Sequence, residues 1–357
     1  MDSAQTIAFR RILTSAMKQE ASDLHLVAGS RPMIRVSGSL VPLEDEEVVT
    51  QQNIEAVADA LMTAERKESL TAKRDTIFTV VHEDKIRMKV HAFFEGKKLS
   101  LSLRLLSTVP RPLNELGVPA SFERFTALKE GLVIIGGRQD SGRTTLAASL
   151  LDHINRTRVC HIVTLEDPIE YQILSNKSMI SQREIGVDVP SFEDGLSSAL
   201  KEDVDVLYVS DASKESVLRG VLDCANVGQL VFIIMNTDSA VRALERIQAY
   251  FTGDEELHIR GLLSSVLSGV IIQQLVPKIG GGVVSVHEIL LNTSSMKTII
   301  ASNRLAQVDQ TIRSSRSEGM VSIDHELAAL VRLNRITLDV AKEYAYDQET
   351  LLALVRT

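Results

Sequence analysis

The spacing of hydrophobic positions changes near residue 107. Before that point, short stretches with alternating apolar and polar residues are interleaved with two stretches of helical spacing, residues 4–20 and 53–69. A period of two indicates half-buried strands, and a period near 3.6 indicates amphipathic helices. Strands are expected near residues 22–27, 34–36, 76–81, 86–93 and 99–105. The pattern predicts a small α+β domain over residues 1–106.

Residues 107–119 differ in composition from both sides of the chain. They contain Pro110, Pro112, Pro119 and Gly117, which interrupt regular structure. This composition predicts a linker between two domains.

Beyond the linker, apolar runs alternate with segments of helical spacing. The runs lie at 132–136, 159–165, 204–210 and 229–235, and the helical segments at 144–156, 192–201 and 214–226. This alternation predicts a parallel sheet covered by helices, forming a core over residues 120–292. The core is expected to end with a strand pair, 270–276 and 283–291. Residues 293–357 carry no strand pattern and are predicted to form a helical C-terminal region.

A glycine-rich turn separates the first of these apolar runs from its helix. It reads Gly137-Arg138-Gln139-Asp140-Ser141-Gly142-Arg143-Thr144. The spacing is that of a phosphate-binding P-loop, G-x-x-x-x-G-K-[ST], with arginine in place of lysine. Taken alone, the motif leaves a nucleotide site and an ordinary glycine turn equally open. The candidate phosphate-binding residues are Gly137, Ser141, Gly142, Arg143, Thr144 and Thr145.

Carboxylates follow two of the predicted strands. Glu166, Asp167 and Glu170 come directly after one apolar run, and Asp211 ends the run at 204–210. Ligands of open α/β sheets bind at the carboxyl ends of the strands, so these groups are candidates for catalysis and for magnesium binding. The alternatives are an acidic cap on a helix that follows Pro168, and an ordinary acidic turn after a buried strand.

Several further stretches accompany the P-loop in a fixed order. They are Ala21-Ser22-Asp23-Leu24-His25-Leu26, Arg31-Pro32-Met33-Ile34-Arg35-Val36-Ser37-Gly38, Leu113-Asn114-Glu115-Leu116-Gly117-Val118-Pro119, Thr164-Leu165-Glu166-Asp167-Pro168-Ile169-Glu170, Ser191-Phe192-Glu193-Asp194 and Ala199-Leu200-Lys201-Glu202-Asp203. Together with the P-loop they resemble the type II/IV secretion-ATPase superfamily, and within it the type IV pilus retraction ATPases of the PilT/PilU type. The resemblance extends over nearly the whole chain.

This resemblance implies an architecture and a set of site roles. It implies a PAS-like N-terminal domain, a RecA-like P-loop core and a homo-hexamer with ATP bound between the domains of each subunit. Magnesium would be held by Thr144 and Asp211, and Glu166, Asp211 and Arg104 would take part in catalysis. For Arg104, an exposed arginine on a half-buried sheet is the open alternative.

The same resemblance implies a cellular setting. Expected partners are an active paralogous pilus ATPase and an inner-membrane pilus platform protein. The expected location is cytoplasmic and peripheral to the inner membrane, through these partners.

Departures from the family pattern concentrate at catalytic positions. Arg143 replaces the lysine, Asp140 a glycine, Asp211 a glutamate, and Gln229 and Asn236 two histidines. Arginine and lysine are not interchangeable at a phosphate, and losses within one catalytic unit do not simply add. We therefore expect ATP binding with weak or lost hydrolysis. The alternative is a scaffold or regulatory ring subunit that binds no nucleotide, and a fully active ATPase is the least favoured interpretation.

Composition narrows the possible partners. The net charge is -8, which disfavours nucleic acid as a main partner. The longest uncharged stretch, residues 261–276, is broken by serine and glutamine and is shorter than the ~20 apolar residues that span a bilayer. No secretory signal peptide is expected, because residues 1–10 lack an apolar segment. Direct membrane insertion is therefore not expected.

Overall fold

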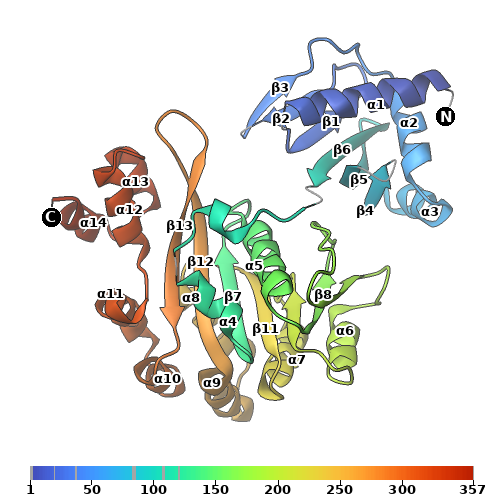
Figure 1. Ribbon diagram of the computed structural model, residues 1–357. Helices are drawn as coiled ribbons and strands as arrows, with labels where there is room; N and C mark the ends of the chain where they lie inside the picture. The colour runs from blue at the N-terminus through green and yellow to red at the C-terminus, as the bar shows by residue number, and fades with distance from the viewer. Residues whose placement is uncertain are drawn as a thin grey trace. The chain divides into compact units, whose positions relative to one another are not determined.

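The chain folds into two compact units, Met1–Thr108 and Val109–Thr357 (Figure 1). A computed structural model describes residues 3–19, 21–36, 38–82, 86–106, 109–119 and 121–356. Each unit has a hydrophobic core of its own.

The first unit is an antiparallel sheet with helices packed against it. The strand order is β3-β2-β1-β6-β5-β4. The strands are β1 (Asp23–Leu26), β2 (Met33–Val36), β3 (Ser39–Pro42), β4 (Asp75–His82), β5 (Ile86–Glu95) and β6 (Lys98–Leu106), and the helices are α1 (Ser3–Lys18), α2 (Gln51–Leu61) and α3 (Ala64–Lys73). Phe9, Leu13 and Ala16 of α1 are buried together with strand residues such as Leu24 and Leu101.

Two details of this unit differ from the sequence-based expectation. The single helix predicted at 53–69 is two helices, because Thr63 is extended (φ -71°, ψ 165°) and its side chain accepts a hydrogen bond from the Arg66 N–H to cap α3. The strand β3 was not predicted. All four of its residues are exposed, so it lacks the apolar alternation that marks a half-buried strand.

The second unit is built on a seven-stranded sheet. The order is β13-β12-β7-β11-β10-β8-β9, and only the edge strand β13 is antiparallel to its neighbour. The strands are β7 (Gly131–Gly137), β8 (His161–Glu166), β9 (Met179–Glu184), β10 (Val206–Val209), β11 (Leu230–Asn236), β12 (Leu267–Pro277) and β13 (Val283–Leu291). The strand β9 was not predicted, because an edge strand that reads MISQRE has no continuous apolar run.

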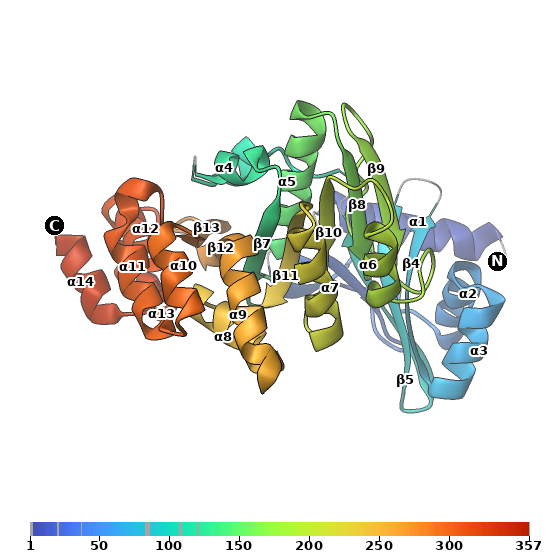
Figure 2. The same cartoon turned by 90° about the horizontal axis from the view of Figure 1, so that it is seen from below.

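Helices cover both faces of this sheet (Figure 2). Along β7, Leu132 and Ile134 belong to one core cluster, and Val133 and Ile135 belong to the cluster on the other face. A strand buried on both faces reads as a continuous apolar run, as the sequence does here. The helices are α4 (Phe122–Ala127), α5 (Arg143–Thr157), α6 (Phe192–Ala199), α7 (Glu215–Asn226), α8 (Ala240–Tyr250), α9 (Asp254–Val266), α10 (Ser294–Ala301), α11 (Val308–Ser314), α12 (Ile323–Arg332), α13 (Leu338–Tyr344) and α14 (Gln348–Arg356).

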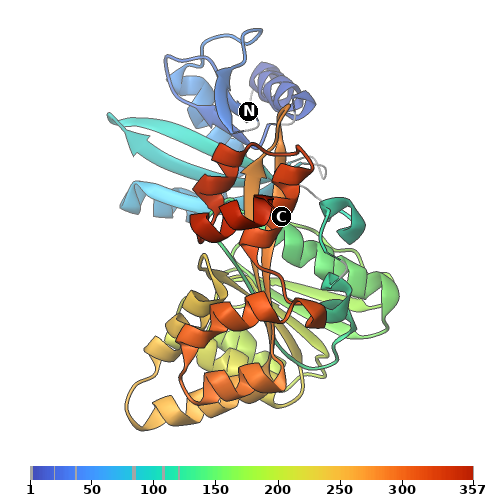
Figure 3. The same cartoon turned by 90° about the vertical axis from the view of Figure 1, so that its left-hand side faces the viewer.

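The C-terminal helices pack in two ways. Met296 of α10 and Ile312 of α11 belong to the main core cluster of the sheet. The later helices α12–α14 form a separate cluster with the strands β12 and β13, through Val276, Val286 and Leu327. Figure 3 shows these helices, in red, beside the orange strands. The C-terminal helices are therefore part of the second unit.

A glutamate is buried where β13 meets α8. Glu288 is 2% exposed, and its Oε1 accepts a hydrogen bond from the Ala240 N–H at 3.0 Å. Burial raises the pKa of Glu288 from its ordinary 4.5 to about 7, and the nearby carboxylates Asp309 and Asp324 act in the same direction. The folded protein therefore holds a proton at this site that the unfolded chain releases.

This proton makes stability depend on pH. Because the folded state binds the extra proton between about pH 4.5 and pH 7, the free energy of unfolding should fall as pH rises through that window. The maximum slope is about 1.4 kcal/mol per pH unit. Glu288→Gln, which mimics the protonated form, should gain stability relative to the wild type between pH 5 and pH 8 in urea unfolding. Glu123→Gln, on the exposed face of α4, serves as the control. Parallel profiles for Glu288→Gln and the wild type would contradict the assignment.

Candidate functional site

The glycine turn lies between the carboxyl end of β7 and the start of α5. Gly142 caps the helix with φ +83°, a conformation that favours glycine. A Cβ on Gly137 would lie 2.1 Å from Ser141 Oγ and 2.6 Å from the Gln273 carbonyl oxygen. Both glycines are thus required by the local geometry, and the turn presents the amino end of a 15-residue helix at the sheet edge. Such an end attracts anions.

A buried hydrogen-bond chain holds this turn in place. The Gln273 side chain donates to the Ser141 carbonyl at 2.7 Å and accepts from His287 Nε2 at 3.1 Å. The His287 backbone N–H donates to Glu326 of α12 at 2.6 Å. Gln273 is 4% exposed and His287 is fully buried. We name this set the Gln273 relay; it runs from the P-loop through β12 and β13 to the C-terminal helices.

Sequence reasoning missed the relay, because neither Gln273 nor His287 belongs to a motif identified in the sequence. The signal present in the sequence is a glutamine within the apolar strand pattern of residues 270–276. A buried amide needs hydrogen-bond partners, but the sequence does not say which groups supply them.

Arg143, at the position of the P-loop lysine, reaches the neighbouring strand. Its Nη1 donates to the Met235 carbonyl of β11 at 3.0 Å. Burial lowers the pKa of the Arg143 guanidinium, and Tyr208, Asp211 and nearby carboxylates partly offset this effect. Arginine stays charged at neutral pH even so. The P-loop therefore contains a partly buried cation that already donates one hydrogen bond to the fold.

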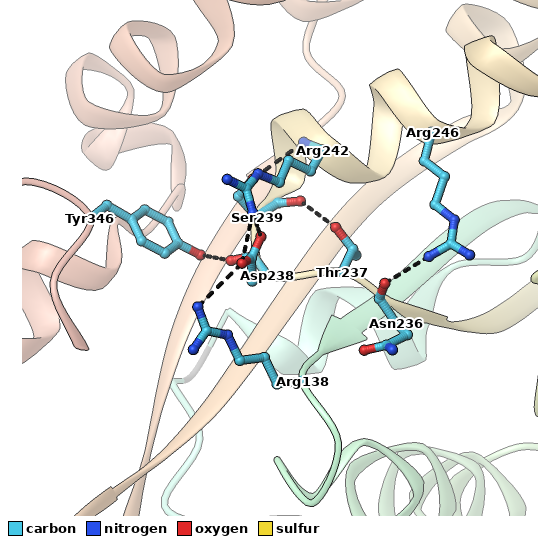
Figure 4. Close-up of polar contacts among 8 residues, drawn as sticks. All are labelled: Arg138, Asn236, Thr237, Asp238, Ser239, Arg242, Arg246 and Tyr346. Atoms are coloured by element: carbon cyan, nitrogen blue, oxygen red, sulfur yellow. Dashed lines mark hydrogen bonds and ion pairs between the residues drawn. The ribbon is translucent and has the colours of Figure 1, made fainter. Parts of the chain in front are cut away.

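Other arginines lie close to Asp238, which follows β11 (Figure 4). Asp238 stands between two guanidinium groups, with Arg242 Nη1 2.9 Å from both carboxylate oxygens and Arg138 Nη2 at 3.4 Å. The Tyr346 hydroxyl donates to the Asp238 carbonyl. These residues line a cavity of about 760 Å³ that also borders Asp140 and Ser141. Arg138 is thus paired with Asp238 in this conformation.

The predicted acidic residues come to the same sheet edge. Glu166 is 4% exposed, and its Oε1 accepts hydrogen bonds from Thr164 Oγ1 at 2.7 Å and from Gln182 Nε2 at 3.0 Å. Asp211 follows β10 and accepts a hydrogen bond from Ser213 Oγ at 2.9 Å. Parallel pairing of β8 with β10, of β10 with β11 and of β11 with β7 aligns these strand ends with the P-loop. The strand β9, missed from the sequence, supplies Gln182.

Three more residues singled out in the sequence, Thr145, Asn236 and Gln229, have side-chain or strand partners in the structure. Thr145 Oγ1 lies 2.8 Å from the Tyr171 hydroxyl, within hydrogen-bond distance. Asn236 ends β11 opposite Gly137, whereas Gln229 lies at the other end of that strand and donates to the Ala199 carbonyl at 3.0 Å. Of the two positions where the family has histidine, only Asn236 is therefore near the turn.

Arg104 belongs to the first unit. Its Nε donates to Asp23 Oδ1 at 3.0 Å, across the pairing of β6 with β1. This ion pair stabilises the first unit's sheet. A role toward a nucleotide stays a prediction.

Two buried hydroxyl groups near the turn have no hydrogen-bond partner within the described part of the chain. They are Ser141 Oγ and the hydroxyl of Tyr208 on β10, whose residues are 6% and 1% exposed. Burying an unpaired hydroxyl is costly, so such groups mark places where a ligand can supply the partner. Sequence reasoning missed Tyr208, because it reads as one apolar residue in a buried strand.

The described residues contain no cluster of three or more His, Cys, Asp or Glu side chains that could hold a metal ion. Magnesium in nucleotide sites needs no such cluster, because phosphate oxygens and water supply most of its ligands. The hydroxyl of Thr144 and the carboxylate of Asp211 are among the oxygen-bearing groups at this edge.

A glycine turn between a parallel strand and a helix, with carboxylates on the adjacent strand ends, defines a P-loop protein with a RecA-like core. The chain belongs to the Type II/IV secretion system protein family, whose model matches residues 2–281. The predicted superfamily is thereby confirmed.

Individual relatives are similar over almost their full length. The type IV pilus retraction ATPase PilT of Pseudomonas aeruginosa is 34% identical over 97% of this chain and 98% of its own. The type IV pilus ATPase PilU of the same organism is 28% identical over 98% of this chain and 91% of its own. A crystal structure of the pilus retraction motor PilT with bound ADP has 31% identity and a TM-score of 0.88 over 96% of this chain and 98% of its own. The predicted fold class is therefore confirmed.

The Gln273 relay should make a measurable contribution to stability. Gln273→Met keeps the side-chain length but leaves the Ser141 carbonyl and His287 Nε2 without this partner. We expect the free energy of unfolding to fall by roughly 2–4 kcal/mol, the cost of two unsatisfied buried groups. The measurement is urea unfolding followed by circular dichroism. Gln307→Met, at an exposed position, should change stability by less than about 0.5 kcal/mol. Equal effects of the two substitutions would contradict the role of the relay.

Proposed function

We propose that this protein is a motor-ATPase-like subunit for type IV pilus retraction and twitching motility that binds ATP and hydrolyses it weakly or not at all. The observation that carries the proposal is the turn from Gly137 to Gly142. It retains both required glycines and the helix amino end, while Arg143 donates to the Met235 carbonyl. The relatives named as type IV pilus ATPases, one of them for pilus retraction, match over nearly their whole length and support the pilus assignment.

In this proposal the backbone of the turn and the amino end of α5 bind the polyphosphate. Thr144 and Asp211 provide oxygen ligands for Mg²⁺, and Thr145, Ser141 and Arg143 complete the phosphate contacts. The two unpartnered hydroxyl groups at this edge fit an oxygen-rich ligand. Bound magnesium would neutralise charge on the phosphates and polarise their oxygens.

Weak hydrolysis follows from the groups that would act on water. Asp211 is one methylene shorter than a glutamate, and Glu166 already accepts hydrogen bonds from Thr164 and Gln182. Removing one preorganised transition-state contact typically costs a factor of ~10²–10³ in rate. Arg104 is the third group proposed for catalysis.

The proposed assembly is a homo-hexamer that works with an active paralogous pilus ATPase and an inner-membrane platform protein. This would place the chain in the cytoplasm, at the inner membrane through its partners. No described helix combines the length and the apolar character needed to cross a membrane. Within each subunit we propose a PAS-like domain (1–106), a linker (107–119), a RecA-like core (120–292) and a helical C-terminal region (293–357).

A second candidate function is a scaffold or regulatory ring subunit that binds no nucleotide. Two observations favour it. Arg143 already has a partner within the fold, and Asp140 adds a carboxylate to the turn at φ +60°. A like charge beside the phosphates opposes binding.

Titration with a fluorescent ATP analogue and magnesium separates the two functions. We expect saturable binding to the wild type, at least about tenfold weaker in Arg143→Ala because a charged phosphate contact is lost. Arg156→Ala, at the far end of the same helix, should bind like the wild type. Phosphate release should be far slower than in an active motor. Absence of binding to the wild type would favour the scaffold, and motor-like turnover abolished by Asp211→Asn would overturn the proposal of weak hydrolysis.

The negative charge of Asp140 should weaken nucleotide binding. Asp140→Asn removes the charge and still tolerates positive φ, whereas Asp140→Gly also frees the backbone. Because Asp140 is exposed, its charge should reduce the free energy of nucleotide binding by about 1 kcal/mol, which is roughly fivefold in affinity. Both variants should bind the ATP analogue more tightly, with Asp140→Gly the tighter. Unchanged or weaker binding by both would show that the Asp140 carboxylate does not face the phosphates.

A further inference from the structure

Tyr208 lies on β10, one of the strands whose carboxyl ends form the candidate site. It is 1% exposed, and on β10 it is in register with Thr164 of β8 and Phe232 of β11. Its ring packs in the apolar layer between the sheet and α5, where Leu146 and Phe232 also lie. A phenylalanine would fill the same layer, so packing explains the ring but not the hydroxyl.

The hydroxyl has no hydrogen-bond partner among the described residues. A buried tyrosine usually pairs its O–H, because an unpaired polar group in the interior costs free energy. The Tyr208 hydroxyl is therefore a buried hydrogen-bond donor with no acceptor among the described residues. Ser141 Oγ, on the P-loop itself, is in the same situation.

Three charged residues of the candidate site influence the ionisation of this hydroxyl. Burial raises the pKa of Tyr208 well above its usual value; Glu166 and Glu170 raise it further, and Arg143 opposes them. The phenol is therefore neutral at physiological pH and can donate its proton in a hydrogen bond. These residues come from the end of β8, the segment after it and the start of α5, and on β8 Thr164, which is in register with Tyr208, donates to Glu166.

We propose that the Tyr208 hydroxyl is a phosphate-binding group, which donates a hydrogen bond to the terminal phosphate of the bound nucleotide beside the Arg143 guanidinium. This inference rests on the proposed nucleotide binding. The choice of the terminal phosphate follows from Arg143, since that motif position reaches the β- and γ-phosphates in a P-loop. With one Arg143 N–H donated to the Met235 carbonyl, the tyrosine supplies a donor that the compact lysine head would otherwise provide.

The test is Tyr208→Phe, studied by thermal unfolding and by binding of the fluorescent ATP analogue with magnesium. Without nucleotide, the variant should be as stable as the wild type or more stable, because it loses an unpaired buried hydroxyl. With nucleotide, it should bind about tenfold or more weakly, as expected for a lost charge-assisted hydrogen bond. The stabilisation on adding ATP should shrink accordingly. Affinity for ADP should fall less than affinity for ATP.

The control is Tyr250→Phe, which removes a hydroxyl that donates to the Ser213 carbonyl. It should lower the stability of the free protein and leave nucleotide affinity unchanged, the reverse of Tyr208→Phe. If the wild type binds nucleotide and Tyr208→Phe binds ATP equally well, the inference is overturned and the proposed function stands. An equal loss for ATP and ADP would overturn the terminal-phosphate contact. If the wild type binds no nucleotide, both proposals fail.

Discussion

The second unit depends on a close approach between two strands and one turn. At Gly137 the backbone passes so near Ser141 and the Gln273 carbonyl that no Cβ fits. This contact brings the turn down onto β12 and aims the amino end of α5 at the sheet edge. The candidate site groups of the second unit meet at this edge because the parallel strands carry their carboxyl ends there. The conformation of the P-loop turn is therefore set by the packing of the backbone.

Charges of both signs act on each other at this edge of the sheet. Arg143 is a partly buried cation, and burial disfavours its charge. Asp211 and Asp140 offset that cost, although the same carboxylates would repel a polyphosphate. Bound magnesium would reverse the sign of that repulsion for Asp211. These charges agree with the proposed ligand, a magnesium nucleotide that carries its own cation.

The C-terminal helices are tied to the P-loop at two points. The Gln273 relay links the Ser141 carbonyl to Glu326 of α12, and the Tyr346 hydroxyl binds the carbonyl of Asp238, whose side chain pairs with Arg138. Hydrogen bonds buried away from water are costly to leave unmade. Movement of the turn would therefore change contacts of β12, 132 residues further along the chain, and through β13 those of α12. Both Arg138 and Ser141 of the P-loop are therefore linked by hydrogen bonds to the C-terminal region.

The sequence by itself determined the α/β architecture and the location of the phosphate turn, because apolar runs buried on both faces and a glycine spacing are local signals. It also placed Glu166 and Asp211 at strand ends. It could not identify β3 or β9, whose residues are exposed or polar, nor Gln273 and Tyr208. The tertiary structure alone decided which carbonyl Arg143 meets and which buried hydroxyl groups lack partners. Those properties arise only when distant segments pack together, and hydrogen-bond partners far apart in sequence leave no periodic trace in it.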